Sequence, residues 1–375
     1  MKNNAGSKLL ARLDAELAAT RDPVRMACLR AERAGYRARQ GHFDRAREEL
    51  DALRLQFALR PHPEVSVWLC LLEGWIEYYR NLSGSAHGWM KRAYALSAAT
   101  DQRRVRALSA AWLALTDYAA DDVDAMVTHL GDALRIAEPD DHDALARACL
   151  VVAGAFDFVE HKATAQKWYA SARTHARASG DEQMLSAINY NIASHGGQQA
   201  LQAAVFGGDA PGLARHALGA AEATVNYDGW IGTESLAALA PITMAMLWSL
   251  LGDHTKALGL YEAHIKAARD QGLGHLSAVF LADIAWCRWQ DGAHEAAAAD
   301  LEAACAQLGE LRHADDRAVA HGRMAQVCEL LARSNEAHAH RAQADAAWAQ
   351  HREFQRRIVA LLTAAPLLAT ASHIA

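Results

Sequence analysis

Histidine and cysteine are the residues of this sequence best suited to metal binding or nucleophilic catalysis. There are 19 His and 6 Cys residues. His338 and His340 lie two positions apart, which places their rings about 200° apart around a helix and prevents both from binding one metal ion. His313, Asp315 and Asp316 form a second set of cation ligands, but these residue types are common in solvated loops. We therefore expect no metal ion and no other cofactor.

Catalytic motifs are also missing from the sequence. There is no His-Glu-x-x-His zinc motif, no Gly-x-Ser-x-Gly nucleophile elbow and no phosphate-binding loop ending in Gly-Lys-Ser/Thr. Cys149 and Cys287 are candidate nucleophiles, but both lie in apolar helical sequence, where a buried thiol is unreactive. These observations favour a binding protein over an enzyme.

Composition narrows the possible partners and the compartment. The net charge is −6 without long runs of one sign, so the chain lacks the basic surface that nucleic acids require. The polar N-terminus does not resemble a signal peptide, and no run of apolar residues is long enough to span a membrane. The cysteines show no CxxC pair, which favours a reducing, cytoplasmic location. Alanine dominates the 52% of apolar residues, which favours helices over strands.

A repeat organises most of the chain. A small residue opens each copy, a larger one follows four positions later, and another small one follows after three more. Positions spaced in this way share one face of a helix. The copies start at residues 46, 86, 126, 165, 213, 257, 297 and 337, so the period is about 40 residues. The triplets are Ala46/Leu50/Leu53, Ala86/Met90/Ala93, Met126/Leu130/Ala133, Ala165/Tyr169/Ala172, Leu213/Ala217/Ala220, Ala257/Tyr261/His264, Ala297/Leu301/Ala304 and Ala337/Arg341/Ala344.

These copies resemble the tetratricopeptide repeat (TPR) superfamily. The best matches are Gly41-x-Phe43 before Ala46, and Gly252 to Ala257 with Tyr261, while Gly74 resembles the small residue of the preceding helix. Copies two and eight lack the turn glycine, and the period exceeds the usual 34 residues of the family. The resemblance implies an all-α, right-handed superhelical solenoid of about eight antiparallel hairpins. Similar long-period repeats occur in bacterial signalling proteins such as peptide-responsive regulators.

The resemblance also implies that the first helix of each hairpin lines a concave groove. Counting back from each triplet gives mainly aromatic candidates on these helices. We take the groove residues to be Trp68, Trp75, Tyr78, Tyr79, Trp112, Tyr118, Arg147, Asp157, Phe158, Asp283, Trp286 and Trp289. The alternative is that these rings fill space between stacked hairpins, as aromatic side chains commonly do.

A second candidate surface is polar and uncharged. Asn191, His195, Gln198 and Gln202 follow the spacing of one helical face in copy five. Solvated faces usually carry Lys, Glu and Arg, so this face suits hydrogen bonding to a peptide backbone or a small polar ligand. An ordinary solvated face is the alternative. Gly196 and Gly197 on the same helix predict a kink or a close backbone approach.

We divide the chain into a cap helix at 1–21, the repeat array at 22–345, and a C-terminal helix with an apolar tail at 346–375. The predicted function is non-enzymatic binding of a peptide, protein segment or small molecule in the groove, in a sensory or scaffolding role. The partner is expected to be a protein or peptide, for example from a signalling enzyme or transcription factor. The alternative from another class is an α/α-toroid glycoside hydrolase, which would have six hairpins closed in a ring and use a carboxylate beside tryptophan.

Overall fold

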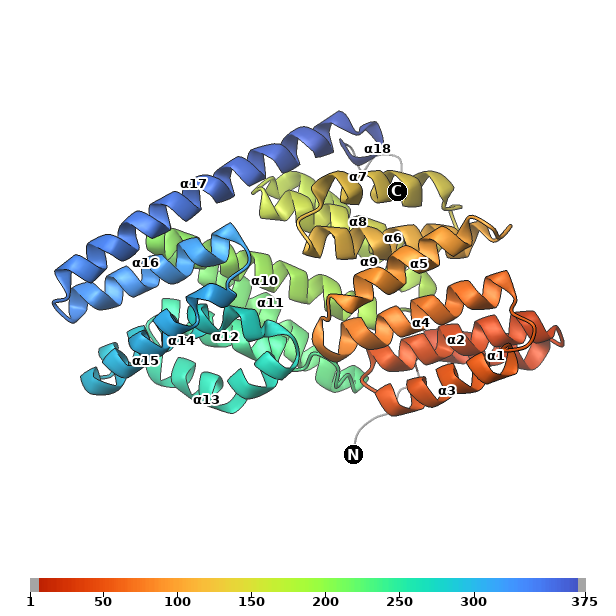
Figure 1. The fold of residues 1–375 in the computed structure, drawn as a ribbon, viewed down its shortest axis with the longest axis horizontal. Coiled ribbons are helices and arrows are strands. Elements are labelled where there is room, and N and C mark those ends of the chain that lie inside the picture. Colours follow the sequence, from red (N-terminus) through yellow and green to blue (C-terminus); the bar gives the residue numbers. More distant parts are fainter. Residues whose placement is uncertain (1–6, 370–375) are drawn as a thin grey trace. The chain divides into compact units, whose positions relative to one another are not determined.

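The protein is almost entirely helical. A computed structural model describes residues 7–369, and no β-strand occurs within that range. Figure 1 shows the arrangement of the α-helices. Two 3-10 helices, Leu273–Leu276 and Leu308–Glu310, also occur among the described residues. The α-helices are α1 Lys8–Ala19, α2 Pro23–Arg39, α3 Phe43–Gln56, α4 Pro63–Asn81, α5 Ser85–Ser97, α6 Arg103–Ala119, α7 Val123–Ile136, α8 His142–Phe158, α9 Lys162–Ser179, α10 Glu182–Phe206, α11 Ala210–Ile231, α12 Leu239–Leu250, α13 His254–Asp270, α14 Ser277–Gln290, α15 His294–Ala306, α16 Ala314–Leu330, α17 Ser334–Ala364 and α18 Pro366–Ala369.

Helices α2 to α17 pair consecutively into eight hairpins within the described residues. Each hairpin has an A helix and a following B helix. Contacts made by the two longest helices, α10 and α17, show that each packs on its hairpin partner. Gly196 of α10 lies against Ala217 of α11, where an added Cβ would come within 3.0 Å of the alanine Cβ. The Nδ1 atoms of His321 in α16 and His340 in α17 lie 2.9 Å apart. The all-helical TPR-like hairpin array predicted from the sequence is confirmed, and eight is the number of hairpins expected for it.

The predicted triplets attach each B helix to its hairpin. In copy one Ala46, Leu50 and Leu53 are completely buried, and the members of copies two, three, four and seven are at most 3% exposed. Gly74 of α4 packs against Met90 of α5, because a Cβ there would lie 2.6 Å from the methionine Cε. A small residue at this position therefore lets the two helices approach closely.

One triplet was predicted in the wrong register. In copy five Leu213 and Ala220 are only partly buried. The buried residues with the same spacing are Ala210, Ala214 and Ala217. Alanine occurs so often in α11 that several registers match the small-residue pattern, and the packing of α11 selects the earlier one.

The hairpin turns explain how copies without a turn glycine close. In the glycine-containing turns Gly41 and Gly252 are left-handed, with φ values of 99° and 83°. Where glycine is missing in copies two and eight, Leu82 and Ala332 adopt the left-handed region instead, with φ values of 50° and 57°. A side chain in this region costs roughly 1–2 kcal/mol, so the hairpin packing must hold these two residues in place.

The chain divides into two compact units. Within the described residues, unit 1 comprises 7–188, 227–236 and 358–369, and unit 2 comprises 189–226 and 237–357. The expected C-terminal segment at 346–375 does not begin at a helix boundary, because residue 346 lies inside α17. Residues 370–375 of the expected apolar tail, and residues 1–6 of the expected cap segment, lie outside the described range.

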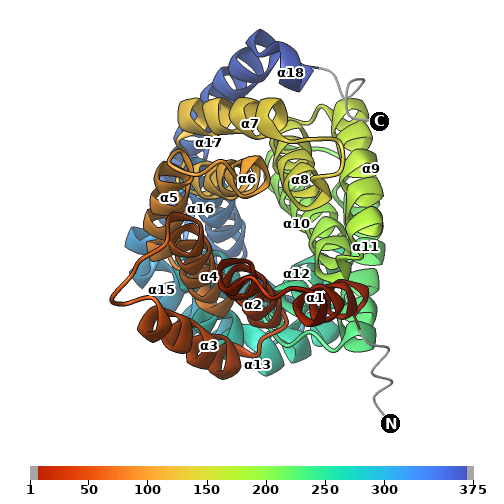
Figure 2. The same cartoon turned by 90° about the vertical axis from the view of Figure 1, so that its right-hand side faces the viewer.

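Unit 1 contains the cap helix α1 and the first four hairpins. Helices α2, α4, α6 and α8 form its inner row, and α3, α5, α7 and α9 lie outside them (Figure 2). The start of α10 returns to the first hairpin, where the Tyr36 hydroxyl donates a 3.0 Å hydrogen bond to Glu182. The peptide N–H of Glu234 also donates to the carbonyl of Gln40 at 2.9 Å. The start of α10 and the segment around Glu234 therefore contact the first hairpin of unit 1.

Unit 2 has the same hairpin packing around a second set of cores. Its buried aromatic residues include Tyr261 of α13 and Phe280 of α14, whose ring centroids lie 6.3 Å apart. A Cβ added to Gly197 of α10 would lie 3.4 Å from Cγ2 of Thr243 in α12, which is an ordinary contact. The close approach expected at the glycine pair is therefore found at Gly196, where an added Cβ would lie 3.0 Å from the Cβ and 3.7 Å from the Cα of Ala217. Between residues 7 and 369, no helix is both long and apolar enough to cross a membrane.

Candidate functional site

The inner row of unit 1 carries a continuous wall of aromatic side chains. Trp68, Trp75, Tyr78 and Tyr79 come from α4, and Trp112 comes from α6. Their rings meet edge to face, with centroid distances of 6.2 Å for Trp68–Trp75 and 5.9 Å for Trp75–Trp112. Tyr78 and Tyr79 contact Trp112 at 5.7 and 5.9 Å. The sequence placed these five rings on the A helices, and the structure brings them together.

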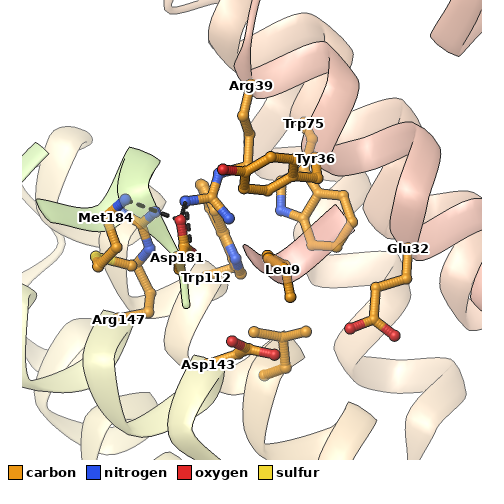
Figure 3. A pocket seen from close by; sticks show the side chains of 11 residues that line it. Leu9, Glu32, Tyr36, Arg39, Trp75, Trp112, Asp143, Arg147, Asp181 and Met184 are labelled. Atoms are coloured by element: carbon orange, nitrogen blue, oxygen red, sulfur yellow. Dashed lines mark hydrogen bonds and ion pairs between the residues drawn. The ribbon is translucent and has the colours of Figure 1, made fainter. Parts of the chain in front are cut away.

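A small cavity lies against this wall. Its volume is about 30 Å³, which is room for two or three water molecules. Figure 3 shows its lining, to which the A helices of the first five hairpins and the cap helix all contribute. The lining residues are Leu9, Glu32, Tyr36, Arg39, Trp75, Leu108, Trp112, Asp143, Arg147, Asp181 and Met184.

Most of the charged groups that line the cavity are paired. Arg39 forms a 2.8 Å ion pair with Asp181, and both side chains are almost completely buried. Arg104 donates to Asp143 at 2.9 Å and also pairs with Glu32. The charges of Glu32 and Asp143 raise the pKa of Arg104 against the opposing effect of its burial. All three lining carboxylates are therefore held by a guanidinium group.

Arg147 differs from the other charged groups in the cavity. Its guanidinium lies over the Trp112 ring, with Cζ 4.0 Å from the ring centroid, and the residue is 3% exposed. It donates a 3.2 Å hydrogen bond to the Tyr79 hydroxyl, and its buried Nε has no partner. Among the described residues, no carboxylate forms an ion pair with it.

A second unused donor lines the same cavity. The Nε1 of Trp75 is buried without a hydrogen-bond partner, and the residue is 5% exposed. Figure 3 shows this nitrogen on the side of the ring that faces the other lining residues. The Nε of Arg39 is a third such donor of the cavity. Buried donors usually have a partner, so three donors without one in a single cavity indicate a place where a ligand atom or water can bind.

The remaining candidates of unit 1 lie outside this cavity. The rings of Tyr118 and Phe158 pack edge to face with their centroids 6.3 Å apart, and both residues are partly buried. Asp157 is 4% exposed. Its carboxylate accepts a 2.7 Å hydrogen bond from the ammonium group of Lys162 and a 3.3 Å hydrogen bond from the Tyr169 hydroxyl. Burial, together with the charge of Asp157, raises the pKa of Tyr169 above its ordinary value. Asp157 therefore holds the turn between α8 and α9.

The candidates on α14 surround a buried charge network of unit 2. Asp283 is 1% exposed and accepts from the hydroxyls of Ser249 and Tyr261, each at 2.9 Å. It also forms a 3.2 Å ion pair with Arg323. The guanidinium of Arg323 lies over the half-buried Trp286 ring, with Cζ 4.8 Å from the ring centroid. Burial raises the pKa of Asp283, and the charge of Arg323 opposes this effect.

Trp289 and the polar stripe of α10 are also placed in unit 2. Trp289 is half-buried and stacks on His294, with ring centroids 4.0 Å apart. In the stripe, Asn191, His195 and Gln198 are partly buried and Gln202 is buried. Gln198 donates a 3.3 Å hydrogen bond to Asp315. None of these side chains lines the cavity of unit 1.

The sequence candidates include only three of the lining residues, Trp75, Trp112 and Arg147, and they miss Leu9, Glu32, Tyr36, Arg39, Leu108, Asp143, Asp181 and Met184. Tyr36 and Arg39 lie on α2, the A helix of copy one, so counting back from Ala46 in the same way would have found them. Asp181 precedes α10 and has no sequence signal of its own. Its place in the site depends on the contact between the start of α10 and the first hairpin.

A second cavity lies where α2, α4 and α6 begin. Its volume is about 430 Å³, and Asp22, His62 and Gln102 line it from the three N-cap positions. Asp22 already accepts from the N–H of Val24 at 3.0 Å. The thiol of Cys28 also lines it, and burial raises the pKa of this thiol to about 12, so it is no nucleophile near neutral pH. His313, Asp315 and Asp316 do not form a metal site, since no group of three ligands is found among the described residues.

Comparison with known proteins identifies the fold. No family model matches the sequence, and no curated protein is similar to it in sequence. The crystal structure of a Rap protein complexed with competence and sporulation factor is similar over 94% of this chain and 92% of that chain, with a TM-score of 0.56 and 13% identity. The apo form of RapI covers 92% of each chain with a TM-score of 0.49 and 11% identity. The first of these likenesses shows that the helical-repeat fold is shared.

Proposed function

We propose that the protein is a non-enzymatic, regulatory repeat protein that binds a peptide or protein segment on the inner row of unit 1. The observation that carries the proposal is the convergence of five consecutive A helices on one cavity. A wall of aromatic rings with a few polar groups is the usual composition of a ligand site. The Rap protein of similar fold was solved in complex with competence and sporulation factor, which supports a ligand-binding role for this fold.

The size of the cavity limits what can enter it. A volume of about 30 Å³ accepts one small chemical group, whereas a whole peptide is far larger. We infer that the ligand inserts one group into the cavity. The rest of the ligand either lies along the inner row or separates the first hairpin from the start of α10. The contacts that would then break are the Arg39–Asp181 and Tyr36–Glu182 pairs.

Several observations favour binding over catalysis. The toroid hydrolase alternative needs six hairpins, and the described residues form eight. A glycosidase also needs two carboxyl groups that are free to act as acid and base or nucleophile. The three carboxylates of the cavity are each paired with arginine. Burial raises the pKa of Cys149 to about 12, which does not favour a thiolate nucleophile.

The partner class and the location are part of the same proposal. We infer a bacterial, cytoplasmic protein whose partner is a segment of a signalling enzyme or a transcription factor, or a free peptide. All six cysteines are free thiols, and five of them are buried, which suits a reducing compartment. A neighbouring gene that encodes a kinase, a cyclase or a transcription factor would support this partner class.

A pool of synthetic peptides of about five to ten residues tests the proposal, since a helical groove of this kind recognises short segments. The pool is incubated with the protein, and the peptides that co-elute in size exclusion are identified by mass spectrometry. We expect Trp112→Phe to reduce the bound fraction, because Trp112 forms the wall of the cavity. Trp289→Phe is the matched control in unit 2 and should bind like the wild type. The proposal is wrong if no peptide co-elutes with the wild type, or if both variants lose binding equally.

A further inference from the structure

Arg147 is a buried cation for which unit 1 supplies no counter-charge. We propose that Arg147 anchors a carboxylate group of the ligand in the cavity of unit 1. This inference rests on the proposed function, because it names the chemical group that the same site recognises. The carboxylate comes from the C-terminus of a peptide, from an acidic side chain or from a small organic acid, and all three present the same chemical group.

The environment of Arg147 supports the assignment. A guanidinium has five N–H donors and stays protonated in proteins. Here one nitrogen donates to Tyr79, the ring of Trp112 covers one face, and the buried Nε–H has no partner. Leaving a buried charge without a counter-charge is costly, so an anion should gain strongly by entering. The flat, forked donor set of arginine matches the two oxygens of a carboxylate.

Unit 2 shows what a similar pair looks like when its charge is balanced internally. Arg323 of α16 lies over Trp286 of α14, as Arg147 of α8 lies over Trp112 of α6. Three residues before Trp286 stands Asp283, which forms the ion pair with Arg323. Three residues before Trp112 stands Ser109, whose hydroxyl donates to the backbone carbonyl of Val105. Arg323 therefore has a carboxylate on the helix that carries its tryptophan, and Arg147 has none there.

The other charges of the cavity do not take the place of this missing carboxylate. Asp181 is held by Arg39, and it also accepts from the N–H of Met184 at 2.9 Å. Asp143 and Glu32 are both held by Arg104. A bound anion would thus meet one unpaired guanidinium, which suits a single negative charge better than a phosphate dianion.

The size and the second donor point to the same group. A cavity that accepts two or three water molecules can replace them with the three heavy atoms of a carboxylate. Trp75 offers its unused N–H to the same space. An indole N–H only donates, so it also requires an acceptor and suits a carboxylate oxygen.

The test uses acetate as the probe and acetamide as its neutral match. The full-length protein is titrated with each compound, and the thermal midpoint and the heat of binding are measured at constant ionic strength. We expect acetate to raise the midpoint saturably and acetamide to leave it unchanged. Arg147→Met should weaken acetate binding at least about tenfold, as expected when a charge-assisted, forked hydrogen bond is lost. Arg135→Met, which alters an exposed arginine of α7, should bind acetate like the wild type.

The outcomes separate this inference from the proposed function. Should Arg147→Met fold poorly, Arg147→Lys keeps the charge and loses the forked geometry, and it should bind acetate more weakly than the wild type. The inference is overturned if acetate has no saturable effect on the wild type, or acts equally on the Arg147 variants. Peptides that bind equally well with and without Arg147 would leave the proposed function standing and overturn the inference alone.

Peptides from the co-elution experiment then identify the source of the carboxylate. Each peptide is resynthesised with a C-terminal amide and, separately, with its acidic side chains replaced by the corresponding amides. Loss of binding on amidation of the terminus assigns the C-terminal carboxylate, and loss with the side-chain amides assigns Asp or Glu. If both forms bind as tightly as the parent, the peptide presents no carboxylate and the inference is wrong. If acetate binds at Arg147 and no peptide does, the ligand is an organic acid and only the peptide proposal fails.

Discussion

Arg39 and Asp181 form a 2.8 Å ion pair although 142 residues separate them in the chain. Arg39 ends the first A helix, and Asp181 immediately precedes the fifth. Burial lowers the pKa of Arg39, but the charge of Asp181, its hydrogen bond to Arg39 and the nearby Tyr79 and Tyr36 together leave the pKa raised. The pair joins the end of α2 in the inner row of unit 1 to the start of α10, and it lines the cavity there.

Breaking this pair should destabilise unit 1. Asp181→Asn leaves the Arg39 charge buried without its partner, which typically costs about 3–5 kcal/mol. Asp270→Asn is the matched control, since its partner Lys266 is 90% exposed and such surface pairs contribute about 0–1 kcal/mol. Urea unfolding followed by circular dichroism measures both changes. An effect of Asp181→Asn no larger than that of the control would show that the pair does not stabilise unit 1.

The two arginine–tryptophan pairs should respond differently to the loss of their charge. Arg323→Met leaves Asp283 buried and unpaired, so it should cost about 3–5 kcal/mol of unfolding free energy. Arg147→Met removes a charge that has no carboxylate partner among the described residues, so without ligand it should cost much less. Chemical denaturation of both variants checks this. Equal losses would mean that Arg147 is a structural cation like Arg323.

The histidine pair between α16 and α17 should make stability depend on pH. Burial, then the neighbouring His340 and Arg317, lower the pKa of His321 from 6.5 to about 4. The pKa of His340 is also lowered, mainly by burial, with Glu336 opposing, and Cys305 lies 3.7 Å from its other ring nitrogen. Between pH 6.5 and 4 the unfolded chain therefore binds more protons than the folded one, and stability must fall as the pH falls.

The expected loss from His321 over this window is at most about 3 kcal/mol, since one pKa unit corresponds to about 1.4 kcal/mol. Below pH 4 this contribution should level off. His321→Gln should flatten the dependence, whereas His338→Gln, on the exposed side of α17, should keep it. Thermal midpoints between pH 4 and 8 provide the measurement. A wild-type profile with the same slope as His321→Gln would contradict the assignment.

Two glycines on helices of unit 1 should give opposite results when replaced by alanine. A Cβ on Gly35 of α2 would lie 2.1 Å from Cε3 of the buried Trp75 ring. We expect Gly35→Ala to cost about 1–3 kcal/mol through overpacking, although alanine favours helix. Gly88 of α5 has no atom within 4 Å of such a Cβ, so Gly88→Ala should gain up to about 1 kcal/mol. If thermal melts show both variants stabilised, Trp75 is not fixed by this contact.

The hairpin array could be predicted from the sequence because its signal is local. The cap helix expected at 1–21 is Lys8–Ala19 among the described residues, and triplets such as Ala86, Met90 and Ala93 are buried where the spacing placed them. Local spacing was less reliable in copy five, where an excess of alanine made two registers look alike. The placement of the aromatic residues on the A helices was local as well, and Trp75 and Trp112 line the cavity. Whether they bind a ligand stays a prediction.

The sequence by itself determined the helices and their pairing, because these depend on contacts between residues a few turns or one hairpin apart. Only the tertiary structure decided which side chains of the A helices share a cavity and which charges are balanced. Asp181 reaches Arg39 across four hairpins, and Arg323 has a carboxylate that Arg147 lacks. Such relationships depend on how successive hairpins stack, and small rotations between hairpins add up over a distance that no local spacing records.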